Sequence, residues 1–161
     1  MPPDYTTADD IQALGRSEAF LAFQERVSRA ARTERPVILI GERGTGKELA
    51  AARLHLLSPR WGAPYMTLNC ASLTPTLIES ELFGHEAGAF TGATRLRKGR
   101  FEMAEGGSLF LDEVGNIPMP AQEKLLRFVE YGTLERVGSS STLHFDVRLI
   151  AATNVDLRAE T

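Results

Sequence analysis

The stretch that most constrains the fold of this chain is residues 36–49, with the sequence PVILIGERGTGKEL. Its four aliphatic residues, 37–40, predict a parallel strand buried on both faces. The glycines that follow allow the backbone to curl with its N–H groups pointing inward. A helix is predicted to begin at Lys47, which places the positive end of its dipole beside the same loop. The stretch therefore predicts a phosphate-binding loop.

The spacing of this loop matches the pattern G-x-x-x-x-G-K from Gly41 to Lys47, but Glu48 stands where Ser or Thr normally contacts Mg²⁺. Lys47 would reach the β- and γ-phosphates of a nucleotide. An ordinary glycine turn before a surface helix is the alternative, because the strict motif fails at one position. The helix after the loop is predicted to turn one face inward, formed by Leu49, Ala52 and Leu56 or Leu57.

The composition narrows the class of protein. The chain has 161 residues, enough for one domain with a substantial core. Its 18 basic and 21 acidic side chains give a net charge of −3, which offers no broad basic surface for nucleic acid. The single cysteine, Cys70, excludes an internal disulfide and is expected to be buried. The sequence shows no membrane-spanning run or signal pattern, so a cytoplasmic protein without membrane insertion is expected.

A second apolar run, residues 108–111, ends in two adjacent carboxylates, Asp112 and Glu113. Beside a phosphate loop, this pattern is typical of the second half of an ATPase site. Asp112 is suited to hold the water shell of a Mg²⁺ ion, since that ion prefers carboxylate and phosphate oxygens. Glu113 is then placed to orient and deprotonate the attacking water. Two acids that merely start a loop are the alternative, and Lys47 upstream weighs against it.

Two asparagines follow further predicted strands. Asn69 ends the run 65–69, and Asn154 follows the run 147–153. Ligands of open parallel sheets lie at the carboxyl ends of the strands, so both side chains are expected near a nucleotide. For Asn154, sensing of the γ-phosphate is the expected role. For Asn69, a hydrogen bond to its own backbone at the end of the strand is an equally good interpretation.

The segment 84–99, GHEAGAFTGATRLRKG, has four glycines and neither a helical nor a strand period. A loop of this length inside a compact domain is more often functional than padding. Phe90 has no apolar neighbour to pack against locally, which suggests an anchor for the pocket of a partner. Folding of Phe90 back onto the core is the alternative. Residues 134–145 predict a hairpin or second projecting loop, in which Arg136 is interpreted as a solvated side chain.

Two other helices are predicted to serve packing. The first follows Ser17 as its N-cap and carries an apolar stripe, formed by Phe20, Phe23 or Gln24, Val27 and residues 30–31. The second opens at residues 118–120, ends at Gly132 and is expected to turn one face inward, formed by Gln122, Leu125, Leu126 and Val129.

Taken together, GERGTGKE (41–48), ELFGHEAGAFTGA (81–93), GGSLFLDE (106–113) and AATN (151–154) resemble the AAA+ domain of sigma-54-dependent transcriptional activators, the bacterial enhancer-binding proteins. Within that family the chain looks most like the phage-shock-type activators, which begin directly with the ATPase domain. The resemblance implies a P-loop NTPase fold, a three-layer α/β/α sandwich with a mostly parallel sheet. It assigns residues 1–10 to a lead-in and residues 11–161 to a partial ATPase domain, incomplete at its C-terminus.

The resemblance also implies a role for each matching residue, with ATP and Mg²⁺ as ligands. Asp112 would hold Mg²⁺ and Glu113 would be the general base. Asn69 would be a switch residue that pairs with this glutamate, and Asn154 would be the first sensor. The family's own loop carries Glu at the position of Glu48. The nucleotide contacts would be Gly41, Glu42, Arg43, Gly44, Thr45, Gly46, Lys47, Glu48 and Asp112.

For partners, the resemblance implies the sigma-54 factor of RNA polymerase, whose closed promoter complex would be remodelled by ATP hydrolysis. It implies a ring of identical subunits, a hexamer in the complete protein, and DNA binding only through a C-terminal domain that this chain does not carry. Arg136 in the second loop would assist the first. The contacts in the first loop would be Gly88, Ala89, Phe90, Thr91, Gly92 and Ala93.

Family members continue into a further strand, arginine fingers and a helical lid, which this sequence does not contain. A missing arginine finger can lower the rate by about 10³- to 10⁵-fold. The alternative function is therefore a nucleotide- and partner-binding module without turnover. A third possibility, an AAA+ machine that acts on DNA such as a helicase loader, is disfavoured by the GAFTGA sequence and the acidic balance.

Overall fold

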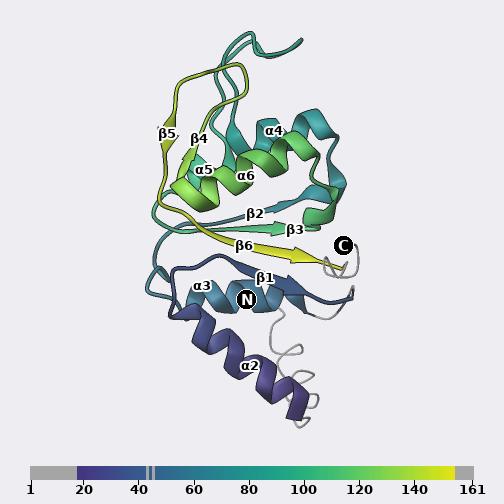
Figure 1. Cartoon of the computed structure of the whole chain (residues 1–161), viewed down its shortest axis with the longest axis vertical. Helices are drawn as coiled ribbons and strands as arrows, with labels where there is room; N and C mark the ends of the chain where they lie inside the picture. The colour runs from purple at the N-terminus through teal and green to yellow at the C-terminus, as the bar shows by residue number, and fades with distance from the viewer. Residues whose placement is uncertain (1–17, 43, 45, 155–161) are drawn as a thin grey trace, which may run out of the picture.

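A parallel sheet forms the centre of the fold in the computed structural model, which describes residues 18–42, 44 and 46–154 (Figure 1). The strands are β1 (Val37–Ile40), β2 (Tyr65–Asn69), β3 (Ser108–Asp112) and β6 (Arg148–Thr153). They lie in the order β1-β6-β3-β2 and all run in the same direction. Their carboxyl ends therefore meet at one edge of the sheet (Figure 1). The predicted α/β fold with a mostly parallel sheet is confirmed.

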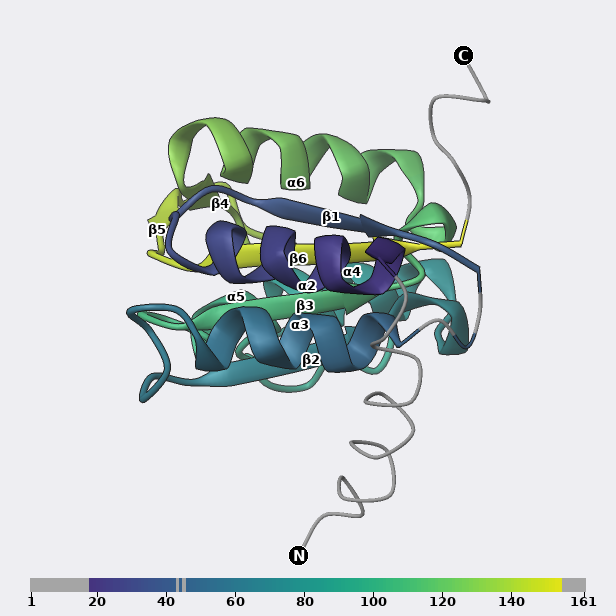
Figure 2. The ribbon, with the colours of Figure 1, turned by 90° about the horizontal axis from the view of Figure 1, so that it is seen from below.

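Helices cover both faces of this sheet, as predicted for a three-layer sandwich (Figures 1 and 2). One face carries α4 (Pro75–Phe83), α5 (Arg100–Met103) and α6 (Met119–Tyr131), and the other carries α2 (Glu18–Ala31) and α3 (Lys47–Leu56). A hydrophobic cluster fills each side. In β3, Leu109 and Leu111 belong to the first cluster and Phe110 to the second. This alternation is what a strand buried on both faces produces.

The first strand departs from the prediction. Leu39 is buried under the helices, but Ile38 and Ile40 are 55% and 48% exposed. The expectation that this run is buried on both faces was therefore wrong. The reason is topological, because β1 is the outer strand of the sheet as described, and the helices that pack on it cover one of its faces.

Helix α3 is also rotated relative to the prediction. The buried side chains are Ala50, Ala51, Leu54 and His55, whereas Leu49, Leu56 and Leu57 are exposed. The small alanines let this helix approach both α2 and the sheet closely. His55 is tolerated in the core because its ring nitrogens bond to the hydroxyl of Ser108 at 2.9 Å and the carbonyl of Ala63 at 3.1 Å. Because histidine is polar, the pattern of apolar residues in the sequence does not mark this position as buried.

Helix α6 ends at Gly132 as predicted, in a left-handed C-cap with φ of 70°. Of its predicted inward face, Leu125 packs against the core as expected, but Leu126 and Val129 do not. Ala121 and Phe128 are buried, while Leu126 and Val129 are 61% and 45% exposed. The position of the aromatic ring decides the rotation, because Phe128 packs on Phe101 with ring centroids 4.4 Å apart.

Helix α2 is joined to the beginning of β6 by a buried arginine. The side chain of Arg148 is 2% exposed and donates to the carbonyls of Ala30, of Ala31 at 3.2 Å and of Arg35 at 3.2 Å. These carbonyls include the last of α2, where a cation is favoured by the helix dipole. Ser17, the predicted N-cap of this helix, lies outside the described residues.

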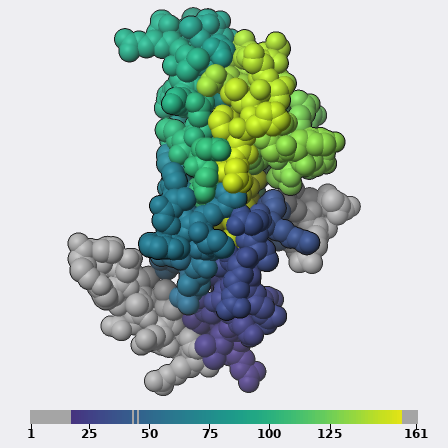
Figure 3. Space-filling model, turned by 90° about the vertical axis from the view of Figure 1, so that its left-hand side faces the viewer, coloured from purple at the N-terminus to yellow at the C-terminus, as the bar shows by residue number. Residues whose placement is uncertain are grey.

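Two segments project from the layer of α4, α5 and α6. The first is residues 84–99, and the second is the connection between β4 (Thr133–Leu134) and β5 (Leu143–His144), which pair as the predicted antiparallel hairpin. Figure 3 shows the first segment as an arm that extends beyond the body of the molecule, at the end away from α2. Among the described helices, none is both long and apolar enough to cross a membrane.

Candidate functional site

The glycine-rich loop connects the end of β1 with the start of α3, as the sequence predicts. Gly41 donates its N–H to the carbonyl of Thr153 at 3.2 Å, which ties the start of the loop to β6. Gly44 and Gly46 have φ of 79° and 84°, a conformation that side chains with a Cβ rarely adopt. The predicted contacts Arg43 and Thr45 lie outside the described residues.

Lys47 is curled over this loop. Its ammonium donates to the carbonyl of Gly41 and, at 3.3 Å, to the carbonyl of Glu42. The side chain is therefore held at the mouth of the loop by weakly charged oxygens, which a phosphate could replace. Glu48, the next residue, is exposed at the first turn of α3.

The two predicted carboxylates lie at the end of β3, beside the same loop. Asp112 accepts the backbone N–H of Glu113 at 2.9 Å, and Glu113 itself has φ of 56° and ψ of 50°. Both line a cavity of about 430 Å³ whose walls come from the loop, α3 and β3. The fold thus brings two stretches together that are more than sixty positions apart in the sequence. The lining residues are Gly44, Gly46, Lys47, Glu48 and Leu49 from the first stretch, and Asp112 and Glu113 from the second.

The last strand lies between the two halves of this site. β6 pairs with β1 on one side and β3 on the other, and Thr153 stands in register with Ile40, the residue before the loop. Thr153 is buried and the next residue, Asn154, is exposed at the carboxyl edge of the sheet. The structure therefore places Asn154 at the edge of the sheet where the sequence predicts it.

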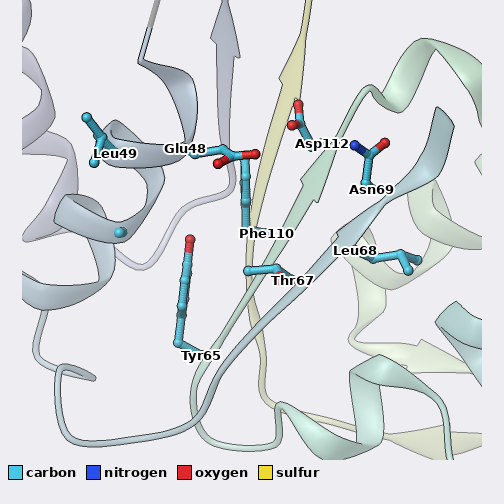
Figure 4. Close-up of a pocket in the computed structure, with 9 residues that line it drawn as sticks. Glu48, Leu49, Tyr65, Thr67, Leu68, Asn69, Phe110 and Asp112 are labelled. Carbon is cyan, nitrogen blue, oxygen red and sulfur yellow. The ribbon is translucent and has the colours of Figure 1, made fainter. Parts of the chain in front are cut away.

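Asn69 makes the backbone hydrogen bond of one interpretation, and the nucleotide contact of the other stays a prediction. It is the register partner of Asp112 across β2 and β3, and the two side chains lie next to each other at the strand ends (Figure 4). Its side-chain oxygen also accepts the backbone N–H of Ala71 at 2.9 Å, which caps the short 3-10 helix η1 (Cys70–Ser72). Asn69 therefore has a local structural role in addition to its place beside the carboxylate.

A second cavity of about 340 Å³ adjoins the first and shares Glu48, Leu49 and Asp112 with it (Figure 4). Tyr65 rises along its side with its hydroxyl pointing toward α3 (Figure 4). Burial, and then the charge of Glu48, raise the pKa of Tyr65 to about 12, so its hydroxyl stays protonated in neutral solution. Burial likewise raises the pKa of Cys70 to about 12, as expected for an inert core thiol.

The arm, residues 84–99, ends in a compact turn at its tip. Gly88 donates to the carbonyl of Ala93 at 2.6 Å, which closes the turn, and Ala93 is buried. Thr91 and Gly92 are exposed. Phe90 is half-buried, with the centre of its ring 4.9 Å from that of His85. It therefore folds back onto His85 at the base of the arm, whereas the alternative placed it on the core, and neither described hydrophobic cluster includes it.

Arg136 is not the solvated side chain that the sequence suggested. Its side chain is 17% exposed and forms ion pairs with Glu102 at 2.7 Å and with Glu86 at 3.4 Å. These acids come from α5 and from the arm, so Arg136 connects the two projecting segments at their base. Sequence reasoning missed Glu102, because its partner Arg136 lies 34 residues away. It also missed the hydrogen bond between Ser80 and His85, because Ser80 lies on α4 and His85 lies in the arm, so no helical or strand period links them.

Comparison with known proteins decides the family. Residues 13–161 match the family described as the sigma-54 interaction domain. The chain belongs to this family. It is 60% identical over 146 residues to the Psp operon transcriptional activator of Escherichia coli (strain K12), covering 91% of this chain and 45% of that protein. It is 55% identical over 144 residues to a Nif-specific regulatory protein of Rhodobacter capsulatus, covering 89% of this chain and 25% of that protein.

The chain is also similar to solved structures. NtrX from Brucella abortus in complex with ADP has a TM-score of 0.82 at 34% identity, over 96% of this chain and 34% of that one. The same protein in complex with ATP gives 0.80 at 36% identity, over 89% and 30%. The P-loop NTPase domain of an E. coli sigma-54 transport activator shares the fold, with a TM-score of 0.59 at 21% identity over 90% and 81%. The chain thus has a P-loop NTPase fold.

Proposed function

We propose that this chain binds and hydrolyses ATP as the AAA+ part of a transcriptional activator, and that it engages the sigma-54 factor of RNA polymerase through residues 88–93. The observation that carries the proposal is the cavity of about 430 Å³, which is lined by Lys47, Asp112 and Glu113 together with the glycine-rich loop. The activator role is supported by the sigma-54 interaction family and its named relatives. Nucleotide binding is supported by NtrX, which was solved with ADP and with ATP.

The residues of the cavity suit phosphoryl transfer to water. Lys47 would exchange the carbonyls of Gly41 and Glu42 for the β- and γ-phosphates, and the backbone of the loop would surround them. A Mg²⁺ ion fits this donor set, because Asp112 presents a carboxylate in the cavity that Lys47 lines, and the ion would neutralise phosphate charge. Glu113 would take the proton of the attacking water. Asn69 would report the state of the site to the rest of β2, and Asn154 would sense the γ-phosphate.

The partner side of the proposal rests on the exposed tip of the arm. Thr91 and Gly92 are solvent-exposed near the middle of residues 84–99, where a partner can reach them. Arg136 would assist by holding the base of the arm rather than by direct contact, because its charge is already paired. In the complete protein, identical subunits would form a ring, and the hydrolysis cycle would move the arms against the promoter complex.

The first test is nucleotide binding and turnover by this chain. A fluorescent ATP analogue should bind the parent chain in the presence of Mg²⁺, and Lys47→Ala should weaken binding at least about tenfold, because charged hydrogen bonds to phosphate are strong. Arg53→Ala is the matched control, since Arg53 is an exposed cation of the same helix, α3. Binding that ignores Lys47 would refute the nucleotide site.

Phosphate release then separates the two functions that the sequence left open. Release that disappears in Glu113→Gln supports an ATPase with Glu113 as its base. Binding without any release supports the module that binds nucleotide and partner but does not turn over.

The partner assignment is tested on the arm itself. Thr91→Ala should retain nucleotide binding and lose association with purified sigma-54 in a co-sedimentation assay. Thr94→Ala is the control, because Thr94 is also an exposed threonine of the arm but lies beyond residues 88–93. Association that survives Thr91→Ala would count against the assignment of the tip.

A further inference from the structure

The base of the arm, where Gly84, His85 and Glu86 meet Arg97 and Val137, is called the neck here, and His85 lies at its centre. This residue and Arg97 exchange two backbone hydrogen bonds, of 3.0 and 2.9 Å, which close the arm at its base. On its other side, Val137 of the second projecting segment accepts from Glu86 at 3.0 Å and donates to Gly84 at 2.9 Å. Both projecting segments therefore meet at His85, which bonds to Arg97 through its own backbone and to Val137 through the backbones of its two neighbours.

The side chain of His85 is also fixed. It is 8% exposed, and its Nδ1 shares a hydrogen bond of 2.6 Å with the hydroxyl of Ser80, which is 3% exposed on α4. A hydrogen bond between two buried groups restricts the orientation of the ring, since breaking it would leave both polar atoms unpaired. The imidazole therefore presents one defined surface toward the arm.

Phe90 packs on that surface. The two rings meet edge to face, with centroids 4.9 Å apart and an angle of 68° between their planes. This geometry suits the charge distribution of aromatic rings. The second segment supports the same arrangement, because Gly138 lies so close to Ala89 that an added Cβ would collide with it. The contact shelters the one aromatic side chain of residues 88–93.

We propose that His85, oriented by Ser80, is a positioning residue that holds Phe90 folded against the neck and thereby sets how much of this side chain a partner can reach. The inference rests on the proposed partner role of residues 88–93. A partner that takes up the Phe90 ring must first separate it from His85, so the ring contact opposes binding. Loosening the contact should then expose Phe90 and strengthen association.

The exposure of residue 90 can be measured without any partner. Trp61 is the chain's single tryptophan and is 69% exposed, so Trp61→Phe with Phe90→Trp gives a fluorescent reporter at position 90 alone. In this background, Ser80→Ala frees the imidazole, and His85→Gln removes the ring while keeping a polar group for Ser80. Both changes should shift the emission of the reporter to longer wavelength and increase its quenching by acrylamide.

Ser58→Ala is the matched control for this experiment. Ser58 is 4% exposed and its hydroxyl donates to the carbonyl of His55 at 2.6 Å, but it lies at the end of α3, on the other side of the sheet. Its replacement should lower the melting temperature without moving the emission of the reporter. If Ser80→Ala and His85→Gln leave the quenching of the reporter equal to that of the control, the positioning role is refuted.

The binding experiment uses purified sigma-54 and the natural Phe90. A lost aromatic contact corresponds to about a two- to tenfold change in affinity, so His85→Gln should tighten association by that factor and Ser80→Ala by less. If quenching rises but affinity for sigma-54 falls or stays constant, the ring contact does not control partner access and the proposal fails. If Phe90→Ala binds sigma-54 as the parent does, the proposed partner role of the tip is wrong, whatever the reporter shows.

Discussion

Glu113 is held in a backbone conformation that its own Cβ disfavours. Among the described residues, Glu113 is the one non-glycine residue with a positive φ, which is 56°. Left-handed backbone costs an ordinary residue about 1 to 2 kcal/mol. Strain of this kind persists where the surroundings over-determine the conformation, as they do at functional sites. Here the end of β3, the bond from the Glu113 N–H to Asp112 and the helical turn 114–116 leave the residue little choice.

The strain predicts an unusual order of stability at position 113. Glu113→Gly and Glu113→Ala both remove the carboxylate, but only the glycine removes the Cβ that makes positive φ costly. The glycine variant should exceed the alanine variant in free energy of unfolding by about 1 kcal/mol, measured in urea, and both should lack the proposed ATP hydrolysis. An alanine variant as stable as the glycine variant would show that the backbone at 113 relaxes.

At the scale of single elements, the neck of the arm depends on two glycines that face each other. A Cβ on Gly99 would collide with backbone atoms of Gly84 and Leu82, although the φ of Gly99, −85°, is ordinary. Position 99 therefore requires glycine because there is no space for a side chain, and not because of its backbone conformation.

Gly99→Ala should lower the free energy of unfolding by about 1 to 3 kcal/mol, as overpacking does. The protection of the His85 and Arg97 amides against hydrogen exchange should fall with it, because these amides close the neck. Gly62→Ala is the control, since a Cβ there meets open space and the change should stay within about 0.5 kcal/mol. Equal losses in the two variants would contradict the packing argument.

The elements also show what a sequence of this kind can and cannot reveal. Lys47, Asp112 and Asn69 were predicted to converge because carboxyl ends of parallel strands meet at one edge, and their convergence needs no knowledge of packing. The inward faces of α3 and α6 could not be predicted, because rotation of a helix is decided by its neighbours. The partners of Arg136 lie 34 and 50 residues away, and no local pattern announces them.

For the whole molecule, the outer face of β1 is an exposed apolar surface. Ile38 and Ile40 lie on the outer strand of the described sheet with about half of each side chain in solvent. Open sheet edges with apolar side chains favour association of chains.

Ile38→Thr with Ile40→Thr should keep the β-branched shape that strands prefer and reduce concentration-dependent self-association of the isolated chain. Sedimentation velocity should show the variant closer to the chain mass of 17.7 kDa. Leu56→Thr, a change at an exposed leucine of α3, should leave self-association as it is in the parent. Self-association that is unchanged by the double substitution would exclude β1 as its cause.

Stability of the whole chain should depend on pH through His55. Burial, as the largest cause, lowers the pKa of this imidazole below its ordinary value of 6.5. The folded protein favours the neutral form of the ring. As the pH falls through 6.5, His55 therefore takes up its proton in the unfolded chain before it does so in the folded protein. Stability is therefore fully present above that pH and declines as the pH falls toward the folded pKa, by up to about 1.4 kcal/mol per unit.

Urea unfolding at about pH 7.5 and at about pH 5 should show this decline in the parent chain. His55→Gln should be less stable at neutral pH and lose most of the difference between the two conditions. His144→Gln, a change at an exposed histidine of β5, should retain it. A difference that survives in His55→Gln would assign the decline to other groups.

The position of β6 has a consequence for how the protein is made. This strand comes last among the described elements, yet it lies between β1 and β3, and its first residue, Arg148, holds α2 in place across 117 positions of sequence. A ribosome adds about 5 to 20 residues per second, so α2 and β1 wait on the order of ten seconds for the strand that joins them to β3. During that time β1 lacks its described strand partner, and β2 and β3 form a pair whose β3 edge is open. The exposure of the nascent chain to chaperones is thus set by the order of the strands and not by the stability of the finished fold.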